Sequence, residues 1–385
     1  MSEKKFDLLV FIGRFRPFHN GHKHVIDQAL KQAHNVLVLV GSANRPRTHK
    51  NPWTYGEVCA MIHDSYDWHA TPPKDLPLKI APLDDWMHDN DFRWLMDVQR
   101  EVQNEIDEIR RLTGEQELRV GLVGFSKDHT SYYLKKFPQW GSVDVGPHKH
   151  DGHVLNATEI RRKLLDQVPA GSDSMLEALH EMRALLPAPV SEFLRHWVTQ
   201  PRNIKTLEDL AEAVAFAREY KEEHKFQGKM SLGVYMGKPY EAIMTTVDSV
   251  VIQSGHVLLI KRKFNPGKGL WALPGGFGHA NEWLRDANAR ERSEETRIKL
   301  SRHVLDLAFR FKHVFSDPNR SDDRGRIITH AYLHLLNDRA QLPEVEADDD
   351  ASEVRWWPLG LMDPNQMYSD HYWIVRKMID LIPCD

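Results

Sequence analysis

The first 160 residues alternate short apolar runs with stretches of helical spacing, and this alternation restricts the fold more than any other feature of the chain. It is typical of a parallel β-sheet whose strands are joined by helices, because each helix carries the chain back along the sheet. We expect buried strands at Phe6–Ile12, Asn35–Val40, Leu78–Ile80 and Leu118–Val123. Helices are expected from about Gly21 to Ala33 and over Phe92–Leu112.

The pattern changes twice further along the chain. From Ser174 to about Phe226 it is helical, and Thr206 is expected to begin a helix because threonine can cap and acidic residues favour the first turn. After Gly228 we expect strands at Thr245–Val251, His256–Arg262 and Arg326–Leu336, and a final helix. Because 385 residues exceed the roughly 250–300 that one core supports, we predict an α/β domain at residues 1–200, a helical connector at 201–238 and a second α/β domain at 239–385.

Composition restricts the partners and the compartment. The 51 Lys and Arg residues nearly balance 55 Asp and Glu, for a formal charge of −4, so we expect no nucleic-acid partner. No stretch approaches the ~20 apolar residues of a membrane span, and the apolar run near the start is too short for a signal peptide. Cys59 and Cys384 give neither a disulfide framework nor zinc-ligand spacing. We therefore expect a cytoplasmic protein without a membrane partner, and homo-oligomer formation is left open.

The first candidate site is the segment Gly13–His22, between the first strand and the first helix. Backbone N–H groups of a tight turn and of a helix N-terminus attract anions. His19 and His22 are three residues apart, so on a helix they share a face and can stabilise charge on a transferring nucleotidyl group. Two of 22 histidines also fall at this spacing by chance, but the strand–turn–helix context favours a functional role.

This segment resembles the GxFxPxHxGH signature of the nucleotidyltransferase superfamily, which it matches at Gly13, Phe15, Pro17, His19, Gly21 and His22. Asn156–Arg161 resembles the later ISxTxIR element at Thr158, Ile160 and Arg161. We expect Thr158 to cap the helix and Arg161 to clamp a phosphate. The resemblance implies a Rossmann-like domain with catalytic His19, His22 and Arg161, and with nucleotide phosphates bound by Gly13, Arg14, Phe15, Arg16, Gly21 and Thr158.

The acceptor is indicated by three further segments. Asn51–Glu57 resembles the NPFTxGER element of archaeal-type nicotinamide mononucleotide (NMN) adenylyltransferases, with Val58 in place of the final arginine. Gly124–Tyr133 and Phe137–Trp140 resemble the bifunctional bacterial branch of that family. The resemblance implies an NMN site at Asp85, Asn90, Trp94, Lys127 and Asp128, with Trp94 stacked on the nicotinamide ring. A core aromatic and a solvated turn are the alternatives for Trp94 and for the Lys127–Asp128 pair.

The second candidate site is the spacing Gly276-x5-Glu282-x7-Arg290-Glu291-x2-Glu294-Glu295-x2-Ile298. On a helix, Glu291, Glu294 and Glu295 share one face, where like charges repel unless a cation is bound. Carboxylate oxygens suit Mg²⁺ or Mn²⁺, and a diphosphate would complete the coordination. A solvated acidic helix face is the alternative.

The spacing resembles the Nudix box, GX5EX7REUXEEXGU, and so implies an α/β/α sandwich. Arg292 departs from it at an apolar position, and Arg297 replaces the glycine that normally ends the helix, which costs up to ~1 kcal/mol if the position is left-handed. By resemblance, Arg290 orients a glutamate, Glu294 and Glu295 are catalytic, and the metal is held by Gly275, Glu282, Glu291, Glu294 and Glu295.

The second substrate is indicated by Phe315–Arg326, which resembles the DPxRDPRGR loop of ADP-ribose pyrophosphatases. It implies ADP-ribose contacts from Gly276, Arg320, Arg324 and Arg326, with a polar surface loop as the alternative. A general base outside the box could come from the acidic stretch Glu344–Glu353, but the sequence does not single out a residue, and the favoured interpretation of this stretch is a solvated loop.

The whole chain therefore resembles the bifunctional NMN adenylyltransferase/Nudix hydrolase family. The implied reactions are NMN plus ATP giving NAD and diphosphate, and hydrolysis of ADP-ribose to AMP and ribose 5-phosphate with Mg²⁺ or Mn²⁺. The alternatives are a transferase for another phosphorylated acceptor, a Nudix domain for another nucleoside diphosphate derivative, and a Nudix ligand sensor without turnover. Retention of Glu291, Glu294 and Glu295 argues against the sensor.

Overall fold

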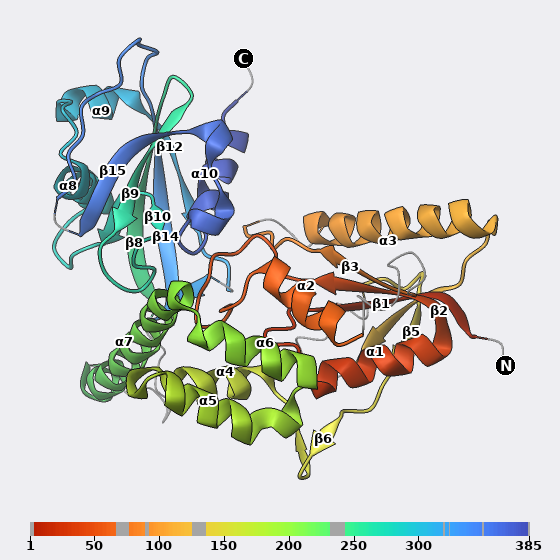
Figure 1. Ribbon diagram of the computed structural model, residues 1–385. Helices are drawn as coiled ribbons and strands as arrows, with labels where there is room; N and C mark the ends of the chain where they lie inside the picture. Colours follow the sequence, from red (N-terminus) through yellow and green to blue (C-terminus); the bar gives the residue numbers. More distant parts are fainter. Residues whose placement is uncertain are drawn as a thin grey trace. The chain divides into compact units, whose positions relative to one another are not determined.

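The computed structural model describes residues 4–66, 77–88, 92–124, 136–231, 243–318, 320–322, 324–348 and 350–383. The chain forms two compact units, Met1–Ala211 and Glu212–Asp385 (Figure 1). None of the described helices is long and apolar enough to cross a membrane.

The first unit is built on a parallel sheet of strand order β3-β2-β1-β4-β5 (Figure 1). Its strands are β1 (Phe6–Gly13), β2 (Ala33–Val40), β3 (Leu78–Pro82), β4 (Val120–Gly124) and β5 (Gly141–Asp144). The four strands expected from the sequence are confirmed, with ends shifted by two residues or fewer. Strand β5 was not expected, because three of its four residues are polar or glycine and three are exposed.

Strand β1 is buried on both faces of this sheet. Leu8, Val10 and Ile12 pack in one cluster with Val98 and Val102 of α3 (Phe92–Thr113). Helix α1 (Asn20–Gln32) covers the opposite face and buries its own apolar side chains (Figure 1). Burial on both faces explains why β1 is an uninterrupted apolar run.

The remaining elements of the first unit are short helices and one hairpin. They are α2 (Tyr55–Asp64), the hairpin of β6 (Lys149–His150) and β7 (His153–Val154), α4 (Ala157–Leu165), η3 (Val168–Ala170), α5 (Ser172–Glu181), η4 (Met182–Leu185) and α6 (Ala188–Thr199). Helix α7 (Pro201–Ser231) follows, and the division between the units falls within it. The expected helix start at Thr206 is wrong. The helix begins at Pro201, because proline lacks an N–H and the first turn needs none.

The second unit is built on a mixed sheet of order β10-β9-β8-β14-β12, in which β8 and β14 are parallel. Its strands are β8 (Met244–Gln253), β9 (His256–Arg262), β10 (Trp271–Ala272), β11 (Gly275–Phe277), β12 (Phe309–Phe315), β13 (Ser321–Asp322), β14 (Gly325–Leu335) and β15 (Ala351–Pro358). Strands β8 and β9 form a hairpin whose turn is Ser254–Gly255, with φ of 46° at Ser254 and 73° at Gly255. The short helices η5 (Leu359–Leu361) and η6 (Pro364–Gln366) follow β15.

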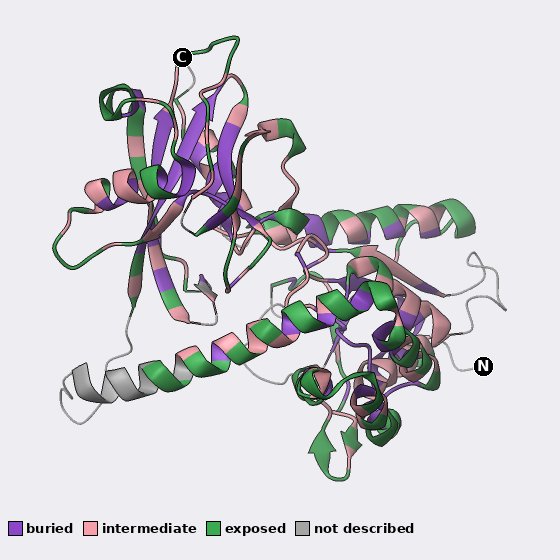
Figure 2. Ribbon diagram, turned by 60° about the vertical axis from the view of Figure 1, so that its left-hand side comes forward, coloured by how far each residue is buried: buried purple, intermediate pink, exposed green. Residues whose placement is uncertain are grey.

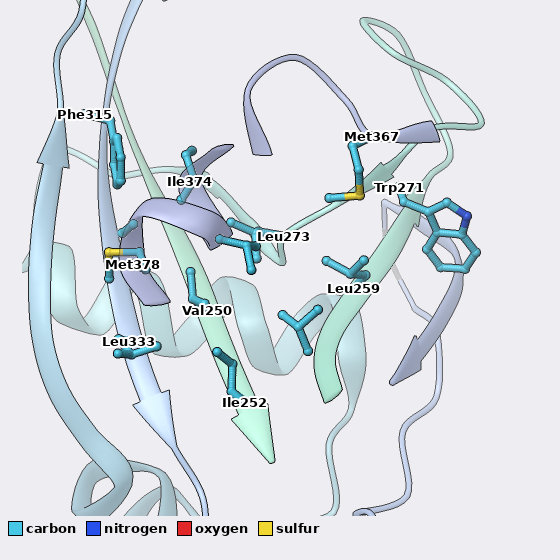
Figure 3. Packing of buried hydrophobic residues seen from close by; sticks show 13 residues of the cluster. Val250, Ile252, Leu259, Trp271, Leu273, Phe315, Leu333, Met367, Ile374 and Met378 are labelled. Atoms are coloured by element: carbon cyan, nitrogen blue, oxygen red, sulfur yellow. The ribbon is translucent and has the colours of Figure 1, made fainter. Parts of the chain in front are cut away.

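Helices cover both faces of this mixed sheet, as expected for an α/β/α sandwich. On one face, α10 (His371–Asp380) packs Ile374 and Met378 against Val250 and Leu333 (Figure 3). Helices α8 (Leu284–Thr296) and α9 (Arg302–Ala308) pack on the other face through apolar side chains that include Ala287. Figure 2 shows runs of buried residues in the strands of this sheet, and eight of the ten residues of β8 are buried.

Leu333 tests the core of the second unit, because its side chain is fully buried. We expect Leu333→Ala to lower the free energy of unfolding of this unit by about 2–5 kcal/mol, since truncation removes apolar contacts and leaves a cavity. Urea-induced unfolding followed by circular dichroism measures this. The matched control is Leu361→Ala, whose side chain is 69% exposed. Equal effects of the two substitutions would contradict the described packing.

Candidate active sites

The turn after β1 requires glycine at two positions because side chains lie against the backbone there. A Cβ atom on Gly13 would lie 2.9 Å from the Phe15 ring, and one on Gly21 would lie 2.9 Å from the His19 ring. Phe15 itself has φ of 55° and is 1% exposed. The turn therefore folds back on itself and brings the end of β1 to the start of α1.

His19 and His22 cap helix α1 in a reciprocal arrangement. The Gly21 N–H donates to His19 Nδ1 at 3.1 Å, and the His19 N–H donates to His22 Nδ1 at 3.4 Å. The two rings stack with centroids 3.7 Å apart. Because both Nδ1 atoms accept hydrogen bonds, a neutral ring carries its proton on Nε2. Nε2 is thus the donor nitrogen of each neutral ring.

Two buried arginines lie beside these histidines. The Arg16 guanidinium donates to the carbonyl oxygens of Trp53 (2.8 Å), Gly41 (2.7 Å) and Ser42 (3.1 Å), so it ties three chain segments together. Arg161 donates to the Arg16 carbonyl oxygen at 2.5 Å. Burial lowers the pKa of each arginine to about 10. Both therefore stay charged near neutral pH, and this concentrates positive charge in a desolvated place.

Thr158 is not the cap of helix α4, contrary to the expectation. The cap is Asn156, whose side-chain Oδ1 accepts from the Thr158 N–H at 2.9 Å. The helix therefore begins at Ala157, and Thr158 lies inside its first turn. There its hydroxyl accepts from Arg161 Nη2 at 3.0 Å, which orients the guanidinium.

These residues line one cleft of about 540 Å³ near the carboxyl end of β1, where open parallel sheets bind ligands. Of the residues expected in the transferase site, it contains Gly13, Arg14, Phe15, Arg16, His19, Gly21, His22, Asp85, Trp94, Thr158 and Arg161. Asn90, Lys127 and Asp128 lie outside the described residues. Ser42 and His148 also line the cleft, and no motif in the sequence pointed to them.

The residues expected to bind the acceptor are partly packed against the protein and partly line the cleft. Trp94 is half-buried and lines the cleft, and its ring centroid lies 6.1 Å from that of Phe137. It thus packs beside a core aromatic, and the stacking on nicotinamide stays a prediction. Asp85 pairs with Arg45 at 3.2 Å. In the Asn51–Glu57 element, Glu57 accepts from Arg47 (2.6 Å) and from Trp197 (2.7 Å), and it closes a capping box with Thr54. Val58 is fully buried, so its side chain offers no contact to a ligand.

Arg290 is the centre of the second candidate site. It donates hydrogen bonds to Glu282 (2.7 Å), Glu291 (2.8 Å) and Glu294 (3.0 Å), and to the Phe277 carbonyl oxygen (3.1 Å). Arg290 lowers the pKa of Glu282 to about 2, so this carboxylate is ionised throughout the physiological range. One guanidinium thus holds three carboxylates from two segments.

The strand β11 lies against the acidic face of α8. A Cβ atom on Gly276 would lie 2.6 Å from the Glu291 carboxylate, and one on Gly275 would lie 2.1 Å from the Val247 carbonyl oxygen. The Gly275 N–H donates to Glu295 at 2.8 Å. Burial raises the pKa of Glu291. Glu295 is 4% exposed, and burial raises its pKa to about 8.

The donor chemistry of this face fits a divalent cation. Glu291, Glu294 and Glu295 line the same cavity and supply hard oxygen ligands. The raised pKa of Glu295 reflects a buried carboxylate that a cation would stabilise in its charged form. Among the described residues, no three His, Cys, Asp or Glu side chains already converge as metal ligands. Arg290 already occupies one oxygen of Glu291 and one oxygen of Glu294.

Arg292 and Arg297, the two residues that depart from the Nudix box, both form hydrogen bonds with neighbouring side chains. Arg292 is 2% exposed and donates to Ser249 Oγ (3.3 Å), Asn288 Oδ1 (3.2 Å) and His334 Nε2 (3.2 Å). Arg297 adopts the left-handed conformation, with φ of 39°, and its Nε donates to Asp348 at 2.7 Å. The expected left-handed geometry at this position is confirmed, and no carboxylate of the acidic face is displaced.

Of the three arginines expected to contact ADP-ribose, two line the cavity and one does not. Arg320 is 6% exposed and donates to Asp370 at 2.6 Å, and Arg324 forms a two-bonded pair with Asp322 (2.7 and 3.0 Å). Both line the cavity, whereas Arg326 is exposed and does not. The Tyr368 hydroxyl donates to Asp322 at 2.8 Å and thereby holds this pair in place.

The cavity has a volume of about 540 Å³ and also holds residues that the sequence did not identify. Of the expected residues, Gly275, Gly276, Glu291, Glu294, Glu295, Arg320 and Arg324 line it, and Glu282 does not. The additional polar lining includes Asp248, Arg262, Tyr368 and His371. From the acidic stretch Glu344–Glu353, Asp350 reaches the cavity wall.

Two family models match the chain, one to each unit. A cytidylyltransferase-like model matches residues 10–163, and a NUDIX domain model matches residues 242–378. Curated relatives match the same two parts. A nicotinamide/nicotinic acid mononucleotide adenylyltransferase of Acinetobacter baylyi is 37% identical over 157 residues, which are 41% of this chain and 74% of the relative. An ADP-ribose pyrophosphatase of Methanocaldococcus jannaschii is 34% identical over 131 residues, which are 34% of this chain and 69% of the relative.

One solved protein matches almost the whole chain. The bifunctional NMN adenylyltransferase/ADP-ribose pyrophosphatase of Francisella tularensis is 30% identical, with a TM-score of 0.77 over 98% of this chain and 99% of that one. A second crystal structure of that protein, complexed with AMP and a Mn ion, matches equally well. The chain therefore belongs to the family of bifunctional NMN adenylyltransferases/ADP-ribose pyrophosphatases.

Proposed function

We propose that the first unit transfers the adenylyl group of ATP to NMN, giving NAD and diphosphate. The observation that carries this proposal is that the residues of both transferase motifs, far apart in the sequence, line one cleft together with Trp94. The phosphate of NMN attacks the α-phosphorus of ATP, the bond to the bridging oxygen breaks, and diphosphate leaves with that electron pair. No covalent enzyme intermediate is needed, so positioning and charge stabilisation supply the catalysis.

The residues of the cleft divide this work. His19 and His22 donate Nε2–H groups to the triphosphate, and their Nδ1 atoms remain tied to the start of α1. Arg161, oriented by Thr158, and the exposed Arg14 neutralise charge that develops on the leaving diphosphate. Trp94 stacks on the nicotinamide ring, whose positive charge favours an aromatic face.

We propose that the second unit hydrolyses ADP-ribose to AMP and ribose 5-phosphate. Glu291, Glu294 and Glu295 would hold Mg²⁺ or Mn²⁺, and Arg324 would contact the anionic substrate. A bound divalent cation polarises the diphosphate and makes water a better nucleophile. The Mn ion in the structure of the Francisella tularensis protein supports the choice of a divalent metal.

Asp350 is the candidate general base of this hydrolysis. Among the described residues of the acidic stretch, it is the one that lines the cavity. The loop before it is fastened to the end of α8 by the Glu346 N–H, which donates to the Thr296 carbonyl oxygen at 2.9 Å, and by the Arg297–Asp348 pair. This loop is therefore held at the end of α8 that carries Glu295, which suits a role in taking a proton from the attacking water.

The two activities are expected to respond to different substitutions. His22→Ala should lower NAD formation by roughly 100-fold or more, because a donor to the developing charge is lost, and should leave ADP-ribose hydrolysis unchanged. Glu295→Gln should lower ADP-ribose hydrolysis and leave NAD formation unchanged, since the neutral amide cannot balance the charge of a bound cation. Chromatography of one tube with NMN, ATP and Mg²⁺ and another with ADP-ribose measures both products. Loss of both activities in either variant would refute the assignment of one reaction to each unit.

Metal affinity is expected to depend on pH through Glu295. Its pKa of about 8 lies above the usual 4.5, so the carboxyl group is protonated at neutral pH and a cation must displace the proton. The apparent affinity for Mn²⁺ should therefore rise with pH, by up to about tenfold per unit, and level off above about pH 8. Isothermal titration calorimetry at several pH values measures this rise. Glu295→Gln should remove most of it, and the same pH slope in that variant would contradict the prediction.

Asp350→Asn should lower kcat for ADP-ribose hydrolysis by roughly 100-fold and leave KM nearly unchanged, because the base acts in the transition state. The matched control is Glu344→Gln, an exposed residue of the same stretch that does not line the cavity. AMP release over a range of ADP-ribose concentrations separates kcat from KM. Equal losses in the two variants would mean that the charge of the whole loop matters rather than the carboxylate of Asp350.

A further inference from the structure

The start of helix α10 borders the hydrolase cavity, through Tyr368, Ser369 and His371. The positive end of a helix favours anions. Asp370 occupies the N-cap position, yet its carboxylate makes no capping hydrogen bond to the helix. It is fully buried and accepts from Arg320 Nε instead. Losing a cap costs roughly 1 kcal/mol, so this side chain stabilises the cavity wall at the expense of the helix.

The next residue, His371, is held in one tautomer. It is 5% exposed, and its Nδ1 accepts from the Leu273 N–H at 2.9 Å. A nitrogen that accepts a backbone N–H carries a lone pair, so the proton of the neutral ring is on Nε2. Leu273 begins the Leu-Pro-Gly-Gly turn that leads to Gly276. His371 therefore fastens α10 to the strand that lies against the acidic face.

The other ring nitrogen, Nε2, makes no hydrogen bond with any of the described residues. The His371 ring lines the cavity. The charged groups that act on the ring are Asp248, Asp370, Arg320 and Arg262, and the Arg320 guanidinium pairs with Asp370 and lies 3.8 Å from Asp248. The two carboxylates beside the ring are therefore partly neutralised, and the ring that carries this donor lines the cavity.

We infer that His371 is a substrate-binding residue of the hydrolase: its Nε2–H donates a hydrogen bond to an anionic oxygen of the ADP-ribose diphosphate. The inference rests on the proposed hydrolase function. The positive end of α10 lies on the same wall as this donor, so a diphosphate oxygen placed there meets two favourable groups.

Two amide substitutions separate this role from that of holding the turn. The amide of asparagine reaches about as far as Nδ1, so His371→Asn can still accept the Leu273 N–H but loses the donor to the cavity. The amide of glutamine reaches about as far as Nε2, so His371→Gln keeps a donor for the cavity and gives up the contact with Leu273. His303→Asn is the matched control, because this histidine is exposed on α9.

The experiment measures AMP release from ADP-ribose by the full chain with Mg²⁺, with NAD formation and thermal melting as checks of folding. His371→Asn should lower kcat/KM by roughly 10- to 100-fold, the effect of losing one hydrogen bond to a charged group. His371→Gln should keep most of the wild-type value, and His303→Asn all of it. If His371→Asn stays active, the inference is overturned, whether or not His371→Gln loses activity.

Loss of activity in both amide variants is resolved by binding. Titration with the α,β-methylene analogue of ADP-ribose should then show weaker binding to His371→Asn than to wild type, and equal binding would overturn the inference. A wild-type chain that neither hydrolyses ADP-ribose nor binds the analogue would refute the proposed hydrolase function itself. Wild-type hydrolysis with a fully active His371→Asn would refute only the role of His371.

Discussion

At both active sites a side chain lies so close to a strand end that a Cβ atom on the neighbouring glycine would overlap it. The Phe15 ring occupies this place at Gly13, and the Glu291 carboxylate occupies it at Gly276. Each strand lies beside a helix that carries candidate reactive side chains. His19 and His22 form the capping arrangement of α1, and the Gly275 N–H donates to Glu295 of α8. A side chain at either glycine would separate strand and helix, and the site would open.

The two sites are charged in opposite senses. The transferase cleft contains buried Arg16 and Arg161, whose pKa values burial lowers to about 10, and an exposed Arg14. This concentration of positive charge suits the polyphosphate that we propose for the cleft. The hydrolase cavity contains carboxylates whose pKa values burial raises, with Arg290 shared among three of them. Arg290 is the positive group on this acidic face among the described residues, and it occupies one oxygen each of Glu291 and Glu294. The proposed metal would meet the remaining oxygens, and it would displace a proton from any carboxyl group that is protonated.

The sequence predicted the elements that carry a periodic apolar signal, and the residues of the two motifs. Strands β1 and β9 lie where the pattern placed them, because buried strands must be apolar on the faces they bury. Thr158 and Thr206 were assigned as caps from local preference. Instead, Asn156 caps α4 and Pro201 is the first residue of α7, and both lie earlier in the chain. A helix begins at the first residue that satisfies its geometry. The sequence around His371 and Asp248 does not mark them as cavity residues. They reach the cavity because α10 and β8 pack against the Leu-Pro-Gly-Gly turn.

The two departures from the Nudix box show why the effect of a motif residue depends on its surroundings. A buried arginine at an apolar position would be severely destabilising alone, but Arg292 meets a serine, an asparagine and a histidine. His334 donates its Nδ1–H to the Leu305 carbonyl oxygen, so its Nε2 can accept from Arg292. Arg297 accepts a left-handed conformation that glycine adopts more easily, and its side chain in return pairs with Asp348 in the loop before Asp350. A glycine there would relieve the backbone but leave that loop with its main-chain contacts alone. The substitution therefore exchanges a small backbone strain for a fastened loop, and the loop it fastens is the one that brings an acidic residue to the cavity.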